Sequence, residues 1–148
     1  MKFRPAMIQD ADLFLGWRND PKTRQMSHNT SEVLRDEHIA WLTKILHDAN
    51  RKLFIAEEDG VPVGTVRADY SDGVCELSWT VAPSSRGGGV GKRMIAQFAS
   101  QISDPVRAEI KVENYASIRI AEYAGMKFER ENEGVLHYRR EAIKINKT

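Results

Sequence analysis

A cluster of glycines lies between a stretch with strand periodicity and a stretch with helix periodicity. The cluster reads Arg86-Gly87-Gly88-Gly89-Val90-Gly91-Lys92, shortly after Pro83. Glycines leave backbone amides uncovered, and amides at the N-terminus of a helix attract negative charge through the helix dipole. The chain must therefore fold so that a strand, a tight turn and a helix meet at a site suited to a phosphate group.

Two common phosphate-binding motifs do not match this cluster. A P-loop requires Gly at the position of Arg86 and Ser or Thr at the position of Arg93. The dinucleotide fingerprint fits Gly87 and Gly89 but requires Gly at the position of Lys92, and it belongs in an opening β-α-β unit. Residue identity excludes both motifs, so the cluster is a different kind of loop.

Turn residues divide the chain into short strands and helices. The pattern predicts strands at residues 2–5, 52–57, 61–70, 74–81, 106–112, 128–131 and 135–139. Helices are expected at 11–18, along an apolar stripe at 33–46 with Thr30 or Ser31 as N-cap, between the glycine cluster and Ile102, and at 114–124. This order mixes an antiparallel meander with a β-α-β unit, which predicts an α/β or α+β fold with helices on both faces of a sheet.

The strand before the glycine cluster alternates in character. Apolar side chains alternate there with polar ones, as Cys75, Leu77, Trp79 and Val81 against Glu76, Ser78 and Thr80. The apolar set is expected to face the core, which would bury the thiol of Cys75 and leave it unreactive. The polar set would then carry the carboxylate of Glu76 toward a cleft.

Charge and length limit the partners that this chain can bind. It has 148 residues, with 22 Lys and Arg against 21 Asp and Glu, so we expect a single domain over residues 1–148 and neither nucleic acid nor a membrane surface as partner. The charge is uneven, because residues 1–74 carry 10 basic and 12 acidic side chains and residues 75–148 carry 12 and 9. An anionic ligand is therefore expected on the C-terminal half.

Cysteine and histidine usage argues against disulfides and metals. Cys75 is the only cysteine, and the four histidines lack metal-ligand spacing, so no metal site is expected. No run of residues has the ~20 apolar positions of a membrane span, and the N-terminus lacks a signal-peptide pattern. These features predict a cytoplasmic location.

The glycine cluster resembles the coenzyme A pyrophosphate loop of the GNAT N-acetyltransferases. That family carries Q/R-x-x-G-x-G/A after a strand that ends near V-x-P. Here Arg86, Gly89 and Gly91 fill the three defining positions after Val81 and Pro83. The loop therefore indicates a place for the pyrophosphate of coenzyme A.

The likeness to this family continues downstream of the loop. Asn114 and Ser117, followed by Gly125 and Met126, stand where the family often carries N-x-x-A/S and then G-F. The order of elements also agrees, so the likeness covers nearly the whole chain. It implies a mixed, mostly antiparallel central sheet of six to seven strands with helices on both faces, and acetyl-CoA as the cosubstrate.

The resemblance also implies which residues contact the cofactor. In the family, the strand before the loop splays from its neighbour, and its free backbone groups hold the pantetheine arm and the thioester oxygen. The expected cofactor contacts are Trp79, Thr80, Val81, Arg86, Gly87, Gly88, Gly89, Val90, Gly91, Lys92, Asn114 and Ser117. Side chains of Arg86, Lys92 or Arg93 could add charge, although Lys92 and Arg93 fit a solvated helical turn equally well.

Acetyl transfer to an amine needs a proton acceptor for the ammonium and a proton donor for the departing thiolate. Glu76 is the candidate base, directly or through water, and its alternative role is an exposed residue or half of a salt bridge. The family often carries Tyr seven residues after the Asn, where this chain has Ala121. The remaining candidates for the acid are Ser117 and Tyr123, with Tyr115, Tyr138 and bulk water as alternatives.

The N-terminal part resembles the acceptor region of two GNAT groups. W-R-N-D-P at 17–21, an N-T pair at 29–30 and E-H-x-x-W at 37–41 recur together in the amino-sugar nucleotide acetyltransferases of the pseudaminic acid type. The second, less similar group acetylates ribosomal proteins and protein N-termini. The expected acceptor contacts are Trp17, Arg18, Asn19, Asn29 and His38, whereas Trp41 is expected to pack against the sheet.

The resemblance implies an acetyl-CoA-dependent N-acetyltransferase that acts on a primary amine by direct attack in a ternary complex. The expected acceptor is a small molecule, an amino-sugar nucleotide or a similar amine. The alternatives are a protein N-terminal acetyltransferase of the ribosomal-protein type and a coenzyme-A-binding regulatory domain without catalysis, suggested by Ala121. Relatives often pair through C-terminal strands, so a homodimer is an open prediction, and residues 135–139 have the alternation that suits such an edge.

Overall fold

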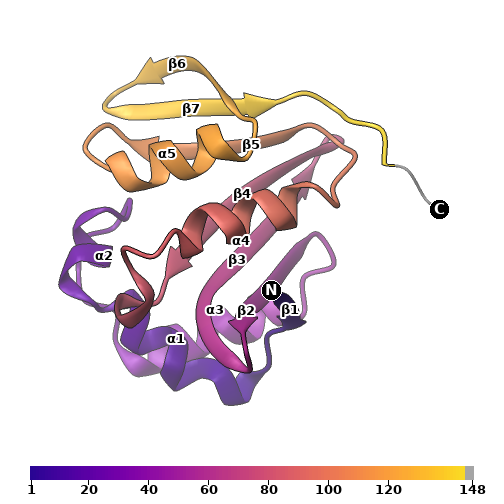
Figure 1. Cartoon of the computed structure of the whole chain (residues 1–148). Coiled ribbons are helices and arrows are strands. Elements are labelled where there is room, and N and C mark those ends of the chain that lie inside the picture. The colour runs from indigo at the N-terminus through magenta and orange to yellow at the C-terminus, as the bar shows by residue number, and fades with distance from the viewer. Residues whose placement is uncertain (146–148) are drawn as a thin grey trace.

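A seven-stranded sheet runs through the molecule, and helices cover both of its faces (Figure 1). This computed structural model describes residues 1–145. The strands are β1 (Lys2–Pro5), β2 (Arg51–Glu58), β3 (Val61–Ser71), β4 (Val74–Val81), β5 (Val106–Lys111), β6 (Lys127–Asn132) and β7 (Val135–Arg140). The α-helices are α1 (Ala11–Arg18), α2 (Pro21–Gln25), α3 (Arg35–Leu46), α4 (Val90–Ala99) and α5 (Tyr115–Tyr123), and short 3₁₀ turns are η1 (Ile8–Asp10) and η2 (Pro83–Ser85).

The strands follow the order β1-β2-β3-β4-β5-β7-β6 across the sheet. Every neighbouring pair is antiparallel except β4 and β5, which are parallel. A parallel pair needs a crossover, and α4 supplies it, because it lies between β4 and β5 in the chain. The mixed, mostly antiparallel sheet confirms the fold class predicted from the sequence.

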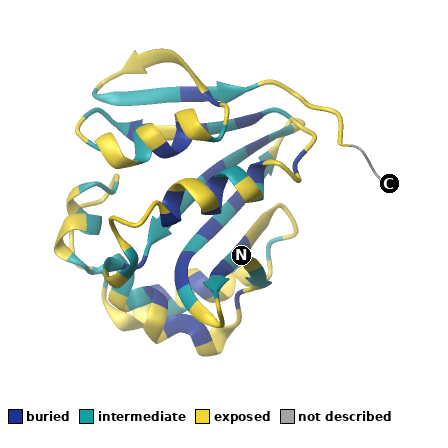
Figure 2. Cartoon of the chain, in the orientation of Figure 1, coloured by how far each residue is buried: buried dark blue, intermediate teal, exposed yellow. Residues whose placement is uncertain are grey.

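The core has two layers, one on each face of the sheet (Figure 2). On one face, Leu77 of β4 packs with Met94 of α4 in a cluster that extends to α5. On the other face, Leu42 of α3 packs with Phe14 of α1 and Ile55 of β2. Successive side chains of a strand point to opposite faces, so one sheet can build both layers.

The N-cap expected at Thr30 or Ser31 is instead Leu34, four or three residues later, so this prediction is wrong. Helix α3 starts at Arg35, after Leu34 in N-cap position without a side-chain cap. Asn19 explains the difference, because its amide donates to the carbonyl of Val33 at 2.9 Å and accepts from the Val33 amide at 2.8 Å. These bonds hold the segment before α3 extended against the end of α1.

The C-terminal strand expected at a sheet edge lies inside the sheet. Strand β7 pairs with β5 on one side and with β6 on the other. The edge is β6, and all six of its residues are exposed. The prediction that residues 135–139 form an edge is therefore wrong, and the intramolecular pairing with β6 is the reason.

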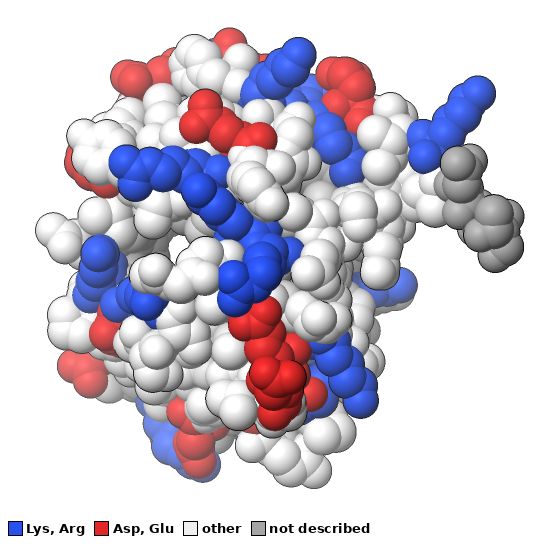
Figure 3. All heavy atoms as spheres, in the orientation of Figure 1, with Lys and Arg blue, Asp and Glu red and all other residues white. Residues whose placement is uncertain are grey.

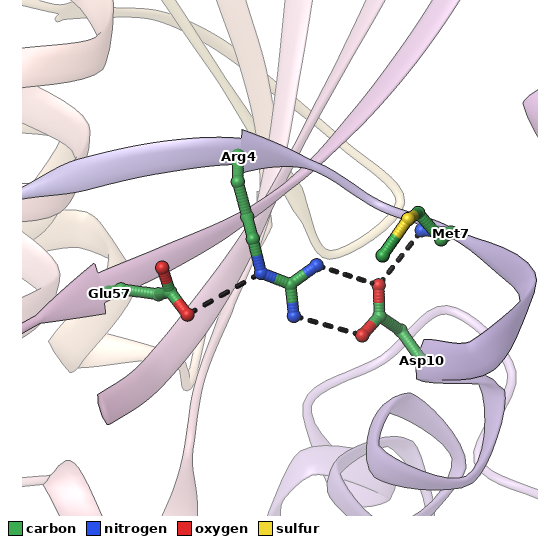
Figure 4. Close-up of polar contacts among 4 residues, drawn as sticks. All are labelled: Arg4, Met7, Asp10 and Glu57. Atoms are coloured by element: carbon green, nitrogen blue, oxygen red, sulfur yellow. Dashed lines mark hydrogen bonds and ion pairs between the residues drawn. The ribbon is translucent and has the colours of Figure 1, made fainter. Parts of the chain in front are cut away.

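A partly buried ion pair ties the first strand to the first helices (Figure 4). Arg4 of β1 donates to both carboxylate oxygens of Asp10, at 2.9 and 3.0 Å, and the same carboxylate accepts from the Met7 amide at 2.8 Å. The Arg4 Nε also contacts Glu57 of β2 at 3.4 Å. The guanidinium of Arg4 lowers the pKa of Asp10, and the Met7 amide adds to this effect.

We expect Asp10→Asn to lower the free energy of unfolding by about 1.5–3 kcal/mol at neutral pH, because the variant loses charge-assisted hydrogen bonds at a buried site. A carboxyl whose pKa falls below 3.8 on folding stabilises the protein at pH values above 3.8. That contribution is lost as the pH falls through the lower, folded pKa, so the difference between variant and wild type should disappear there. Urea unfolding at several pH values measures it.

Asp12→Asn is the matched control. Asp12 also pairs with an arginine, Arg35, at 3.0 Å, but both side chains are exposed, and exposed pairs contribute little. An equal loss in the two variants would contradict the role given to the partly buried pair.

Candidate active site

The parallel strands β4 and β5 pair only at their N-terminal ends. Their register consists of Cys75 with Val106 and Glu76 with Arg107. The other side of β4 pairs with β3 along its whole length, from Val74 to Val81. From Leu77 onward, therefore, β4 keeps one partner and turns its other edge into an opening between the two strands (Figure 1).

The glycine loop has the backbone that its sequence predicts. Gly87 and Gly89 have φ angles of 87° and 74°, in the left-handed region that favours glycine. A Cβ on Gly91 would collide with Ile120 of α5 and would come within 3.1 Å of Val81. These glycines allow a tight turn and a close approach of α4 to β4 and α5, so the first amides of α4 lie beside the open edge of β4.

The first cavity, here called the loop cavity, has a volume of about 500 Å³. Eleven of the twelve predicted cofactor contacts line it, namely Trp79, Thr80, Val81, Arg86, Gly87, Gly89, Val90, Gly91, Lys92, Asn114 and Ser117. Gly88 is the one that does not line it. Helix α2 and the residues after it form the facing wall with Lys22, Thr23, Met26 and Ser27, which the sequence reasoning missed.

Positive charge surrounds the loop cavity. Its lining includes Lys22, Arg86, Lys92 and Arg119 and, within residues 1–145, neither Asp nor Glu. Figure 3 shows Lys and Arg side chains gathered over α4 and α5, beside a hollow that faces α2. The cavity thus combines helix amides with mobile cations, which is the composition of a phosphate site.

Arg86 has a partner that the sequence does not reveal. Its guanidinium donates to Asp20 at 2.8 Å and to the hydroxyl of Thr23 at 2.8 Å. Asp20 also caps α2 by accepting from the Thr23 amide at 3.1 Å. The Arg86 guanidinium lowers the pKa of Asp20, so the bridge between the glycine loop and α2 is ionic at neutral pH.

The second cavity, here called the cleft cavity, lies between β4 and β5 and has a volume of about 380 Å³. It shares six lining residues with the loop cavity: Met26, Ser27, Trp79, Thr80, Asn114 and Ser117. The indole of Trp79 donates to the hydroxyl of Ser117 at 3.1 Å, and Asn114 caps α5 by accepting from the Ser117 amide at 3.2 Å. The side chains of Trp79 and Ser117 therefore stand where the two cavities meet.

Glu109 is the carboxylate that lines the cleft cavity. Its oxygens lie 3.5 Å from Arg107, 3.7 Å from His137 and 3.9 Å from His28. In β5 it alternates with Ala108 and Ile110, which are buried. This alternation in the sequence could have predicted that Glu109 faces away from the core, but the sequence analysis did not identify it.

Glu76, the base expected from the sequence, is placed differently. Its carboxylate lies 2.9 Å from Arg107 Nε, at the last paired position of β4 and β5. It does not line the loop cavity or the cleft cavity. The geometry matches the alternative that the sequence allowed, half of a salt bridge.

The tyrosines offered as acids lie away from the cavities. Tyr123 is 62% exposed, with its ring 5.8 Å from Lys92 Nζ, and Tyr115 is 65% exposed. Tyr138 is buried against Phe128. Ser117 is the candidate acid that lines both cavities.

The third cavity, here called the α1–α3 cavity, has a volume of about 410 Å³. Four of the five predicted acceptor contacts line it: Trp17, Arg18, Asn29 and His38. Asn19 does not, because its amide is occupied by Val33.

The aromatic wall of the α1–α3 cavity includes Trp41. Its ring stacks on His38 at 5.5 Å, and the guanidinium of Arg67 lies 6.0 Å from it. Trp41 is 37% exposed and lines the cleft cavity as well, so one side of it lies over Arg67 of β3 while the rest faces the cavities. Burial lowers the pKa of His38, which keeps this imidazole neutral at physiological pH.

Other chemistry receives no support from the described residues. Cys75 is fully buried, and burial raises the pKa of its thiol to about 11, as expected for an unreactive cysteine. Residues 1–145 contain no group of three or more metal-ligating side chains. No helix in the described part of the chain is long and apolar enough to span a membrane.

Known proteins share this architecture. The chain is 24% identical to the acetyltransferase PseH of Campylobacter jejuni over 122 residues. This alignment covers 80% of this chain and 77% of PseH. A ribosomal-protein-alanine N-acetyltransferase from Brucella melitensis superposes with a TM-score of 0.74, at 21% identity, over 95% of this chain and 99% of its own. The spermidine N-acetyltransferase of Vibrio cholerae, solved with coenzyme A and spermine, superposes with a TM-score of 0.77, at 16% identity, over 93% and 92%.

The family itself is established by sequence. The profile of the acetyltransferase (GNAT) domain matches residues 1–127, which include β1 to β5, the glycine loop and both walls of the loop cavity. The resemblance seen in Arg86, Gly89 and Gly91 is thereby confirmed. The chain belongs to the GNAT acetyltransferase family.

Proposed function

We propose that this protein is an acetyl-CoA-dependent N-acetyltransferase that acts on a primary amine of a small molecule. The observation that carries the proposal is that the loop cavity and the cleft cavity meet at the open edge of β4, beside Trp79 and Ser117. One cavity is suited to a phosphorylated cofactor and the other holds a carboxylate. An acetyl group transferred from the cofactor in one cavity to an acceptor in the other would be transferred where the cavities join.

The loop cavity fits coenzyme A by the chemistry of its lining. Glycine at 91 lets the start of α4 pack closely against Ile120 and Val81, and the left-handed turns at Gly87 and Gly89 expose amides to the pyrophosphate. Lys92 and Arg119 supply mobile cations for its phosphate groups. The free backbone groups of β4 from Leu77 to Val81 supply partners for the amides of the pantetheine arm.

The residues at the junction suit proton transfer. Bound acetyl-CoA supplies a thioester carbon that the amine attacks, with the thiolate as leaving group. Glu109 accepts the ammonium proton in the cleft cavity, directly or through water, and Arg107 holds its carboxylate in place. Ser117 accepts from the Trp79 indole, so its own hydroxyl is free to donate a hydrogen bond to the departing thiolate, which takes its proton from water.

The acceptor that we propose is an amino-sugar nucleotide. Trp17 and Trp41 offer stacking surfaces for a base or sugar, and Asn29 and His38 offer polar groups for hydroxyls. The likeness to PseH and the W-R-N-D-P, N-T and E-H-x-x-W motifs support this class.

Turnover tests the proposed function directly. We expect coenzyme A release from acetyl-CoA in the presence of UDP-linked amino sugars, measured with a thiol reagent, and slower release with free amines and N-terminal peptides. Preference for a peptide would favour the ribosomal-protein type of acceptor instead. Binding of coenzyme A in calorimetry without release for any acceptor would contradict the enzyme and favour a regulatory domain.

Charge reversal tests the loop cavity. Lys92→Glu and Arg119→Glu should each weaken coenzyme A binding on the order of tenfold or more, because a carboxylate replaces a cation beside the phosphates. The loss should shrink at high salt, where such interactions are screened. Lys127→Glu, an equal charge change on the exposed strand β6, is the control and should leave binding unchanged. Calorimetry measures all three.

Two carboxylate variants decide which group takes the proton. We expect Glu109→Gln to lower kcat on the order of 10²-fold, with the loss shrinking at high pH, where the amine is already neutral. Glu76→Gln, the matched change on the neighbouring strand, should affect kcat far less because Glu76 lines neither cavity. The reverse ranking would assign the proton to Glu76, as the sequence predicted.

A further inference from the structure

Arg18 occupies the boundary between two cavities. This residue ends α1, and it lines both the α1–α3 cavity and the cleft cavity. The two cavities also share Asn29, Trp41, Leu53, Thr65 and Thr80, so they form adjoining compartments. A ligand that fills both would pass the guanidinium of Arg18.

The guanidinium of Arg18 is incompletely satisfied. Its Nη2 donates to the carbonyl of Asn29 at 2.7 Å, whereas its Nη1 is buried without a hydrogen-bond partner. Within residues 1–145, no carboxylate lies within ion-pair distance of it. Burial lowers the pKa of Arg18, and the nearby charge of Arg24 lowers it further.

Three other half-buried arginines of this protein have acidic partners, whereas Arg140 has none within residues 1–145 and instead donates to the backbone carbonyls of Ala99, Ile102 and Asp104. Arg4 pairs with Asp10, Arg67 with Asp69 and Arg86 with Asp20, at 2.8 to 3.1 Å. Each of these guanidinium groups is therefore compensated by the fold. Arg18 differs because its Nη1 is buried with no hydrogen-bond partner at all, and a buried donor left unpaired costs free energy that a ligand could recover.

A second unpartnered group faces the same compartment. His38 is 4% exposed, lines the α1–α3 cavity, and its Nε2 is buried without a hydrogen-bond partner. The one acidic side chain that lines this cavity, Glu37, is exposed and does not pair with Arg18. The boundary thus carries the charge and the free Nη1 donor of Arg18, whereas His38 Nε2 is an acceptor, because the neutral ring donates its one N–H to the Ala11 carbonyl.

We infer that the acceptor is an amine that carries an anionic group, a phosphate or a carboxylate, and that Arg18 binds this group. The inference rests on the proposed function, because it places the reacting amine in the cleft cavity near Glu109. The anionic group then lies at the boundary, and the rest of the acceptor extends past His38 and Trp41 into the α1–α3 cavity. Polycationic amines are disfavoured by the charge of Arg18.

Matched acceptors test the inference. In the wild-type protein, kcat/KM for a UDP-linked amino sugar should exceed that for the same free amino sugar, and spermidine should be a poor acceptor. The ratio of kcat/KM for a carboxylate-bearing amino sugar to that for its neutral parent shows whether Arg18 recognises a carboxylate as well as a phosphate. Arg18→Gln should reduce the preference for the anionic member of a pair on the order of 10- to 100-fold, and Arg18→Lys should restore part of it.

Arg24→Gln is the control, because Arg24 donates to the carbonyl of Thr30 and does not line these cavities. Equal losses for anionic and neutral acceptors in Arg18→Gln would overturn the inference, since they would indicate that Arg18 acts by holding Asn29. Calorimetric binding of the UDP-linked amino sugar to wild type and Arg18→Gln provides a readout that needs no turnover. Weaker binding to the variant supports anion recognition even if no acetyl transfer occurs, and equal binding contradicts it.

Discussion

The site depends on the point at which β4 and β5 stop pairing. The two strands form a parallel ladder at Cys75 and Glu76 and then diverge, while β3 continues to hold β4 in the sheet. Backbone groups left without a partner at a sheet edge must bond to solvent or to a ligand. Divergence after two pairs therefore creates both the space of the cleft and a row of hydrogen-bonding groups along it.

The side chain of Trp79 occupies part of the gap between the strands. Its indole donates a hydrogen bond to the hydroxyl of Ser117, at the start of α5. Because Asn114 caps α5 through the Ser117 amide, the position of this hydroxyl is fixed by the helix. The loop cavity and the cleft cavity are thus divided by two side chains that the local backbone holds in place, which suits a junction where a group is transferred.

The N-terminal region and the glycine loop share one carboxylate. Asp20 caps α2 and binds Arg86, a residue 66 positions away in the chain. Helix α2 consequently faces the glycine loop and forms the second wall of the loop cavity. The N-terminal region that resembles an acceptor site in sequence is therefore bonded to the glycine loop. A substitution in α2 can thus alter the position of the glycine loop, and the reverse.

The sequence predicted what local patterns determine. Strand alternation and the glycine loop depend on neighbouring residues, and the structure has them where the pattern indicated. The pairing of Arg86 with Asp20, the bond from Asn19 to Val33 and the ion pair of Glu76 with Arg107 join distant segments. These contacts decide which polar side chains remain free for a ligand, so the assignment of site residues required the fold.

The near-neutral charge of the chain conceals how its cations are used. Several arginines that hold segments together are paired with acids, as Arg4 is with Asp10 and Arg93 is with Glu58. Lys92 and Arg119 in the loop cavity and Arg18 between the other two cavities have no acidic partner within the described residues. Acids thus neutralise some of the cations that hold the fold together, whereas these three unpaired cations line cavities. A chain with a net charge of +1 can in this way offer separate positive sites to two ligands, a phosphorylated cofactor and an anionic acceptor.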